Sequence, residues 1–225
     1  NGGIETGSCF LGMANTRLEF NVEEAGLWDG GIFSVNAVNT HGVSPTSELL
    51  GDIQVASNID AGNHTFLQEA WFKQLLDNVE LTIGLQDLNV EFANSEHGAL
   101  FLNSSFGIIP VISGNFSAPI FPLSNLGFTA KWNISEKSTL LAALYDGTPM
   151  EFDNNPYNLK WQYYSGDGIL YISEYQYSST LNKKQGTYKA GVFFHNHIAE
   201  KQFSKDFPDS LNYYISGIYA YADQK

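Results

Sequence analysis

Nine segments of this chain alternate apolar and polar residues, which is the pattern of β-strands that have one dry face and one wet face. The clearest is VELTIGLQD at 79–87, in which Val79, Leu81, Ile83 and Leu85 share the apolar face. The others run over residues 10–22, 31–40, 64–75, 126–134, 138–145, 168–178, 187–195 and 211–222. The sequence therefore predicts an all-β fold, in which the apolar faces meet either a protein core or lipid.

The connections between these strands alternate between short and long. Short connections lie at 23–30, around Asp77, at 135–137 and at 179–185, and long ones lie at 41–63, 88–125, 146–167 and 196–210. An outer-membrane barrel has short turns on one side and long loops on the other, whereas several long loops are uncommon inside a compact soluble domain. The parity requires residues 52–59 to stay in a loop although they could form a strand. We therefore predict an antiparallel transmembrane β-barrel with no domain boundary.

The charges support a water-filled lumen. The chain has 24 acids against 11 bases, a net charge of −13, which argues against nucleic acid as a partner. The polar faces of the strands are nevertheless balanced, with four acids and four bases: Glu19, Glu69, Glu80, Glu174, Arg17, Lys73, Lys131 and Lys189. A mixed lining suits polar uncharged solutes better than ions, which are selected by rings of one sign.

On this interpretation the two faces of the 79–87 strand meet different solvents. We expect Leu81 and Ile83 to face lipid, and Glu80, Thr82 and Gln86 to face water in the lumen. Aromatic residues near strand ends then suggest the girdles that form at membrane interfaces, although they would also suit the core of a soluble sandwich. These residues are Trp28, Trp71, Phe72, Trp132, Tyr171, Tyr188 and Tyr219.

Two long loops are rich in polar residues. The loop at 88–125 is far too long for a hairpin, so it either folds back into the barrel and narrows it or forms a compact lid on the surface. Its polar contributors are Asp87, Asn89, Glu91, Asn94, Glu96 and His97. The loop at 40–63 is a second candidate for partial occlusion, and solvent-facing decoration is equally plausible for it.

The sequence gives little support for catalysis or metal binding. The paired acids Glu23 with Glu24 and Asp206 with Asp209 sit at turns and ends, where solvated charge explains them better than glycoside hydrolysis. The segment HNH at 195–197 places two imidazoles on one face of an extended segment without a third ligand nearby in sequence. We predict no enzyme activity, no cofactor and no metal site. The main rival is a soluble β-sandwich carbohydrate-binding module, with a glycoside hydrolase third.

Six segments, in order, resemble the carbohydrate-selective porins of the OprB family. They are GLWDGGIFSVNAVNTHG, GDIQVASNIDA, GLQDLNVEF, LFLNSSFG, LYDGTP and GIYAYADQ. The resemblance implies a bacterial outer-membrane barrel of about 16 antiparallel strands, passive diffusion of sugars, inward-folded loops with charged and polar residues, and trimerisation. It places Asn36, Asn39, Asp87, Asn89, Glu91, Asn103 and Asp146 at family-like positions without assigning their individual roles. Arg17 is the only arginine. This scarcity of arginine departs from the family pattern and argues against a cationic eyelet in this chain.

The number of strands also departs from the family. About nine strands cannot close such a barrel, and the parity of the loops requires an opposite-running strand before Asn1. We therefore expect residues 1–225 to be part of a single outer-membrane barrel domain, with strands missing at both ends. The expected partners are sugars in the lumen and outer-membrane lipid.

Overall fold

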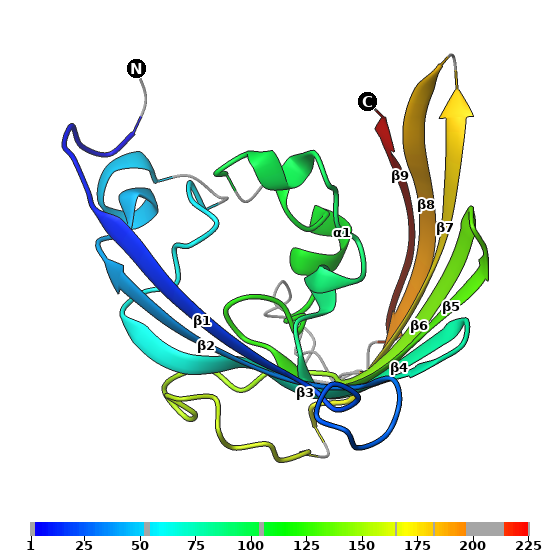
Figure 1. Cartoon of the computed structure of the whole chain (residues 1–225). Coiled ribbons are helices and arrows are strands. Elements are labelled where there is room, and N and C mark those ends of the chain that lie inside the picture. Colours follow the sequence, from blue (N-terminus) through cyan, green and yellow to red (C-terminus); the bar gives the residue numbers. More distant parts are fainter. Residues whose placement is uncertain are drawn as a thin grey trace.

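The computed structural model describes residues 3–51, 55–103, 106–164, 166–181, 183–196 and 214–224. These residues form one antiparallel sheet of nine strands that pair in chain order. The strands are β1 Leu11–Asn21, β2 Gly31–Gly42, β3 His64–Leu76, β4 Val79–Gln86, β5 Asn125–Ser135, β6 Ser138–Asp146, β7 Ile169–Leu181, β8 Lys184–His195 and β9 Ile215–Gln224. Figure 1 shows the sheet curving into an open trough with β1 and β9 at its two sides. The predicted all-β antiparallel fold is confirmed.

The two faces of the sheet follow from the alternation. Directly opposite residues of an antiparallel pair point to the same side, and Glu80 pairs with Lys131 while Ile83 pairs with Phe128. Ile83 is 58% exposed and Phe128 43% exposed on the convex face of the trough. Glu80 and Lys131 lie on the concave face, where they contact each other and Lys131 also contacts Glu91. The predicted separation of the apolar and polar faces is therefore confirmed.

The alternation of connection lengths also holds. Short turns occupy 22–30, 77–78, 136–137 and 182–183, and long connections occupy 43–63, 87–124, 147–168 and 196–214. The described part of 52–59 contains no strand. The helices are short: η1 Thr46–Leu50, η2 Leu88–Val90, η3 Gly98–Leu100 and α1 Pro110–Ser113. In the part of the chain that the structure describes, none of them has the length and apolar character needed to cross a membrane.

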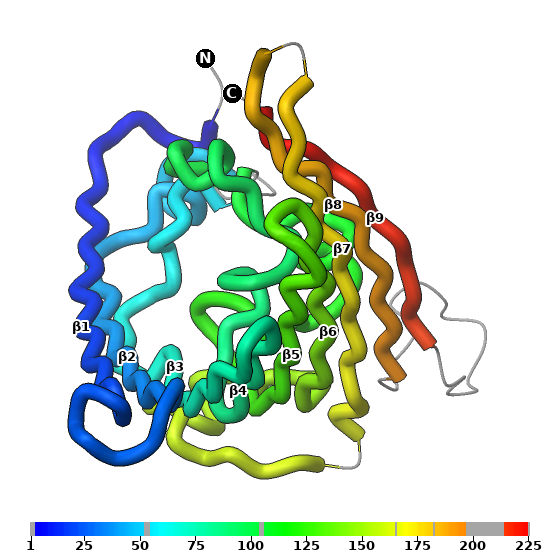
Figure 2. The backbone as a smooth tube through the Cα atoms, turned by 45° about the vertical axis from the view of Figure 1, so that its right-hand side comes forward, coloured from blue at the N-terminus to red at the C-terminus, as the bar shows by residue number. Residues whose placement is uncertain are grey.

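The segment 87–124, called the inner loop below, folds into the trough. Figures 1 and 2 both show it within the curve of the sheet. Leu88, Phe92 and Ile112 of the inner loop belong to one buried cluster with apolar side chains of the wall, including Ile172 and Phe193. The apolar contact area holds the inner loop against the wall, since burial of such side chains is favourable. Of the two alternatives for this segment, the structure therefore shows the inward fold.

The segment 147–168 completes the wall in a way that the sequence did not predict. Because β4 has only eight residues, its pairing with β3 stops at Ala70, and the backbone of β3 before that point needs other partners. The Leu67 N–H donates to the Tyr157 carbonyl at 3.0 Å. The Asn158 side-chain amide donates to the Leu67 carbonyl at 3.1 Å and to the Ser124 carbonyl at 3.3 Å. This segment therefore covers the strand edge that the short β4 leaves open.

Candidate functional site

Four charged side chains form an alternating cluster on the concave face, called the charge quartet below. Lys73 of β3 lies 3.3 Å from Glu80 of β4 and 3.7 Å from Glu91 of the inner loop. Lys131 of β5 lies 3.6 Å from Glu80 and 3.7 Å from Glu91. Each lysine therefore has a carboxylate of the wall on one side and the carboxylate of the inner loop on the other.

Strand register and one capped turn bring the charge quartet together. Glu80 and Lys131 are direct partners across β4 and β5, and Lys73 pairs with Thr82, one step further along the same face. Glu91 follows η2, whose first turn is capped by the Asp87 side chain. The four side chains are 19% to 29% exposed, so water screens them and each pair contributes little to stability. Their main effect is that the two charges of each sign cancel.

A second charge cluster lies on β1 and β3. Arg17 makes a close ion pair with Glu69, and Glu19 lies 3.8 Å from the same guanidinium. The indole N–H of Trp71 donates to Glu69 at 3.3 Å. Asn36 of β2 is buried and pairs in register with both Arg17 and Glu69. The structure therefore gathers these predicted site residues on the concave face.

Two wall residues fasten the inner loop at consecutive positions, 93 and 94. The Glu174 carboxylate accepts a hydrogen bond from the Ala93 backbone at 2.9 Å. The Lys189 ammonium donates to the Asn94 carbonyl at 2.8 Å and to its side-chain oxygen at 2.7 Å. Glu174 is completely buried and also accepts hydrogen bonds from Tyr219, Tyr221 and Gln176. An ionised acceptor with four donors is a strong anchor.

Asp87 holds the base of the inner loop. Its carboxylate accepts hydrogen bonds from the Asn89 backbone at 2.8 Å, the Phe121 backbone at 3.0 Å and the Gln68 side chain at 3.1 Å. Desolvation in this partly buried position raises the pKa of Asp87 to about 6, although these hydrogen bonds favour the charged form. Asn89 in turn donates to the Phe92 carbonyl at 3.1 Å. Asp87 thus joins both ends of the loop to β3.

The remaining predicted residues lie elsewhere. Gln86 accepts a hydrogen bond from Thr129 at 2.8 Å on the concave face. Asn39 lies three positions from Asn36 on a regular strand, so it occupies the convex face and cannot line the lumen as predicted. Asp146 ends β6 on the side of the long loops, next to buried Tyr145. Asn103 belongs to the part of the inner loop that contacts residues 43–63, where Asn58 donates to the Leu102 carbonyl.

Two residues expected in the aromatic girdles point inward instead. Trp71 shares the concave face with Lys73, and Tyr219 is buried against Glu174. Trp71 and Phe72 are adjacent on one strand, so only one of them can face outward. Tyr221 and Asp223 share the face of Tyr219, and the alternation of β9 was the signal that could have identified all three.

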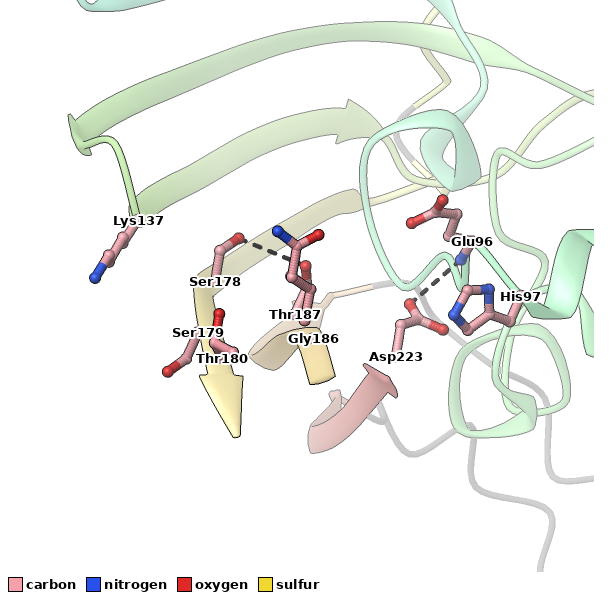
Figure 3. Close-up of a pocket in the computed structure, with 10 residues that line it drawn as sticks. Glu96, His97, Lys137, Ser178, Ser179, Thr180, Gly186, Thr187 and Asp223 are labelled. Atoms are coloured by element: carbon pink, nitrogen blue, oxygen red, sulfur yellow. Dashed lines mark hydrogen bonds between the residues drawn. The ribbon is translucent and has the colours of Figure 1, made fainter. Parts of the chain in front are cut away.

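A polar pocket of about 480 Å³ lies at the short-turn end of β7, β8 and β9. Figure 3 shows Ser178 and Thr187 on one side of it, and Glu96 and His97 of the inner loop with Asp223 on the other. The Ser178 and Thr187 hydroxyls lie 3.5 Å apart, and Asp223 accepts a hydrogen bond from the Glu96 backbone at 3.2 Å. The inner loop therefore reaches through the trough to the ends of these strands.

Comparison with known proteins agrees with these features. Residues 11–216 match the family described as carbohydrate-selective porin, OprB family. The chain belongs to the OprB family of carbohydrate-selective porins. A search of the curated proteins found no match. Members of the family are proteins of the Gram-negative outer membrane, which gives the localisation of this chain.

A solved structure shows the same fold. Pseudomonas putida OprB, in a structure determined at high pH, superposes with a TM-score of 0.72 at 15% sequence identity, over 84% of this chain and 46% of that chain. This chain therefore spans about half the length of that structure. The likeness confirms the predicted barrel architecture, and its low identity assigns no residue role.

The described residues of this chain include some of the candidate metal ligands and acids. Those residues contain no group of three or more histidine, cysteine or acidic side chains that could hold a metal ion. His195 lies buried on the concave face of β8, while His197, Asp206 and Asp209 lie outside the described residues. Glu23 and Glu24 sit in the turn after β1.

Proposed function

We propose that the complete protein is an outer-membrane channel through which carbohydrates diffuse passively, without catalysis. The observation that carries this proposal is the fastening of the inner loop inside the trough, where Glu91 lies between Lys73 and Lys131. A segment fixed against the inner wall narrows the lumen, because its side chains occupy space that water and solutes would otherwise use.

The chemistry of the lining supports uncharged, hydroxyl-rich solutes. Both charge clusters bring opposite signs within 4 Å of each other, so neither presents a ring of one sign to an ion. The proposed lining offers many donors and acceptors of hydrogen bonds, which sugar hydroxyls can use in turn. Its accessible members are Arg17, Glu19, Lys73, Glu80, Asp87, Asn89, Glu91, Asn103, Lys131, Asp146 and Lys189, whereas Asn36, Glu69, Gln86 and Glu174 of the predicted set are buried. A channel must also release its solute, so we expect weak binding.

The convex face supports contact with lipid. Leu18, Ile83 and Ile218 lie there and are 71%, 58% and 78% exposed, which suits the apolar outer band of a membrane barrel. The outer edges of β1 and β9 have no strand partner within the described sheet, and open edges are not tolerated in lipid. We therefore propose that further strands close a barrel of about 16 strands. The resemblance to the family supports the separate proposal that this barrel assembles as a trimer.

The described fold does not favour the rival carbohydrate-binding module. A β-sandwich needs a second sheet packed on the first, and the described residues form a single sheet whose convex face is exposed and apolar. The concave face is covered by the inner loop instead.

Liposome swelling with the full-length parent protein tests the proposed function. Glucose, a disaccharide and neutral non-sugar solutes of matching size are compared, with empty liposomes as the control. Faster swelling with sugars than with size-matched solutes is the expected result. Swelling rates that depend only on the size of the solute would show a general porin. Absence of swelling with correctly inserted protein would contradict the proposal that the protein is a channel.

A further inference from the structure

We infer that the polar pocket at the short-turn end of β7, β8 and β9 is a weak binding site for an uncharged sugar leaving the lumen. This inference rests on the proposed function and adds a second site to it, separate from the charge quartet. Barrel strands of this kind have their short turns on the periplasmic side. A solute that has passed the inner loop therefore meets this pocket at the mouth through which it leaves.

One wall of the pocket presents hydroxyl and amide groups from two paired strands. Ser178 pairs with Thr187, and Thr180 pairs with Gln185. Because directly opposite residues share a face, these four side chains all lie on the concave side of the β7–β8 hairpin. Thr187 also pairs with Asp223 of β9, which extends the same polar surface over a third strand.

The other wall is supplied by the inner loop and is held in place. Asp223 accepts hydrogen bonds from the Ser95 hydroxyl and from the Glu96 backbone at 3.2 Å. The Ser95 hydroxyl also accepts a hydrogen bond from the Gly98 backbone at 2.9 Å. These contacts fix the turn that carries Glu96 and His97 into the pocket. The distance between the walls is therefore set before a ligand arrives, which reduces the entropy cost of binding.

The lining selects the class of ligand. Hydroxyls both donate and accept hydrogen bonds, the amide of Gln185 does the same, and the carboxylates of Glu96 and Asp223 accept them. Sugar hydroxyls are complementary to all of these groups. The pocket is also lined by the Lys137 ammonium, so its charges have both signs and do not select an ion of one sign. A volume of about 480 Å³ lies in the range of small-molecule sites, about 300–1,000 Å³. Since most lining groups are in contact with water, binding is weak enough to allow release.

The test uses the full-length protein in planar bilayers. Glucose or maltose is added to each side in turn, and the half-saturating concentration is read from sugar-induced current noise. The double variant Ser178→Ala with Thr187→Val removes two hydroxyls, and the control Ser216→Ala removes one from the convex face of β9. We expect the double variant to raise the half-saturating concentration about threefold to tenfold, with unchanged conductance in KCl.

The outcomes separate the pocket from the channel. If the wild type and the double variant give the same sugar titration while sugars still swell liposomes, the inferred binding site is contradicted and the proposed porin function is not. Absence of sugar swelling with the wild type would overturn the proposed function itself. The variant Thr187→Ser retains a hydroxyl at this position. We expect it to bind sugar almost as well as the wild type does, which shows that the affinity lost in the double variant depends on the hydroxyls. A folding defect caused by any replacement of Thr187 would weaken binding in both variants.

Discussion

The charge quartet makes a quantitative prediction about ion selectivity. The quartet carries two positive and two negative charges, and the replacement Glu91→Gln removes one carboxylate that lies 3.7 Å from each lysine. The local charge then changes from zero to +1, while the amide keeps the size and most of the packing of the original side chain. Glu174 and Lys189 still fasten residues 93–94, so we expect the inner loop to stay in place.

The expected size of the effect follows from Coulomb's law. An ion passing about 5 Å from the unbalanced charge changes its energy by about 0.8 kcal/mol in water, and screening in 0.1 M salt reduces this to about 0.5 kcal/mol. Anions gain this energy and cations lose it, so their ratio changes by the equivalent of about 1 kcal/mol. The anion-to-cation permeability ratio should therefore rise about fivefold.

The assay is the reversal potential of the full-length channel across a KCl gradient in planar bilayers. Glu136→Gln is the matched control, because it removes the same charge from an exposed position in the β5–β6 turn. Lys131→Gln should shift the reversal potential in the opposite direction. A shift of the reversal potential with Glu91→Gln that is no larger than the shift with Glu136→Gln would place the quartet outside the conduction path.

Three further replacements test how the loops are held, each by the temperature at which the folded barrel loses its characteristic mobility in detergent gels. Glu174→Gln puts an amide N–H where the carboxylate accepts several hydrogen bonds, so we expect a loss of about 1–3 kcal/mol in stability and a larger single-channel conductance; unchanged values of both would contradict the anchor. The raised pKa of Asp87, about 6, means that folding favours its protonated form. The contribution of this protonation to the free energy of unfolding is complete below the ordinary pKa of aspartate. As the pH rises through about 6 this contribution, of up to about 3 kcal/mol, is lost. The stability of the wild type relative to Asp87→Asn, which does not titrate, should therefore fall between about pH 4 and about pH 7, and a constant difference would count against this assignment. Asn158→Asp sets a carboxylate oxygen against the Leu67 carbonyl and should cost about 1–3 kcal/mol, whereas the exposed Asn154→Asp should cost far less.

Strand alternation and loop parity were enough to predict the order, direction and faces of the sheet. Both signals are local, because successive side chains of a strand point to opposite sides whatever the rest of the chain does. Strict use of the same rule would have prevented two errors. Asn36 and Asn39 differ by an odd number of positions, so they cannot share the concave face, and Trp71 cannot face lipid beside Phe72.

The residues that contact the inner loop could not be predicted from the sequence, because these contacts join segments that are far apart along the chain. Glu91 was identified as a polar residue of the loop, but its position between Lys73 and Lys131 follows from the path of the folded loop. The contact between Asn158 and Leu67 depends on how early β4 ends. Neither relation leaves a periodic pattern that a search of the sequence could find.

The wall strands nevertheless carry a signal for where the inner loop docks. A barrel strand between lipid and water should be apolar on one face only, yet β6 has the apolar run Leu140–Leu144 on both faces. On its concave face Leu141 and Ala143 are buried in the cluster that includes Phe92 of the inner loop. Apolar residues on the water side would be unfavourable without such a cover. Loss of alternation within barrel strands therefore predicts the wall on which an inward loop packs, and in this chain it indicates β6 together with the start of β7, Ile169–Ile172.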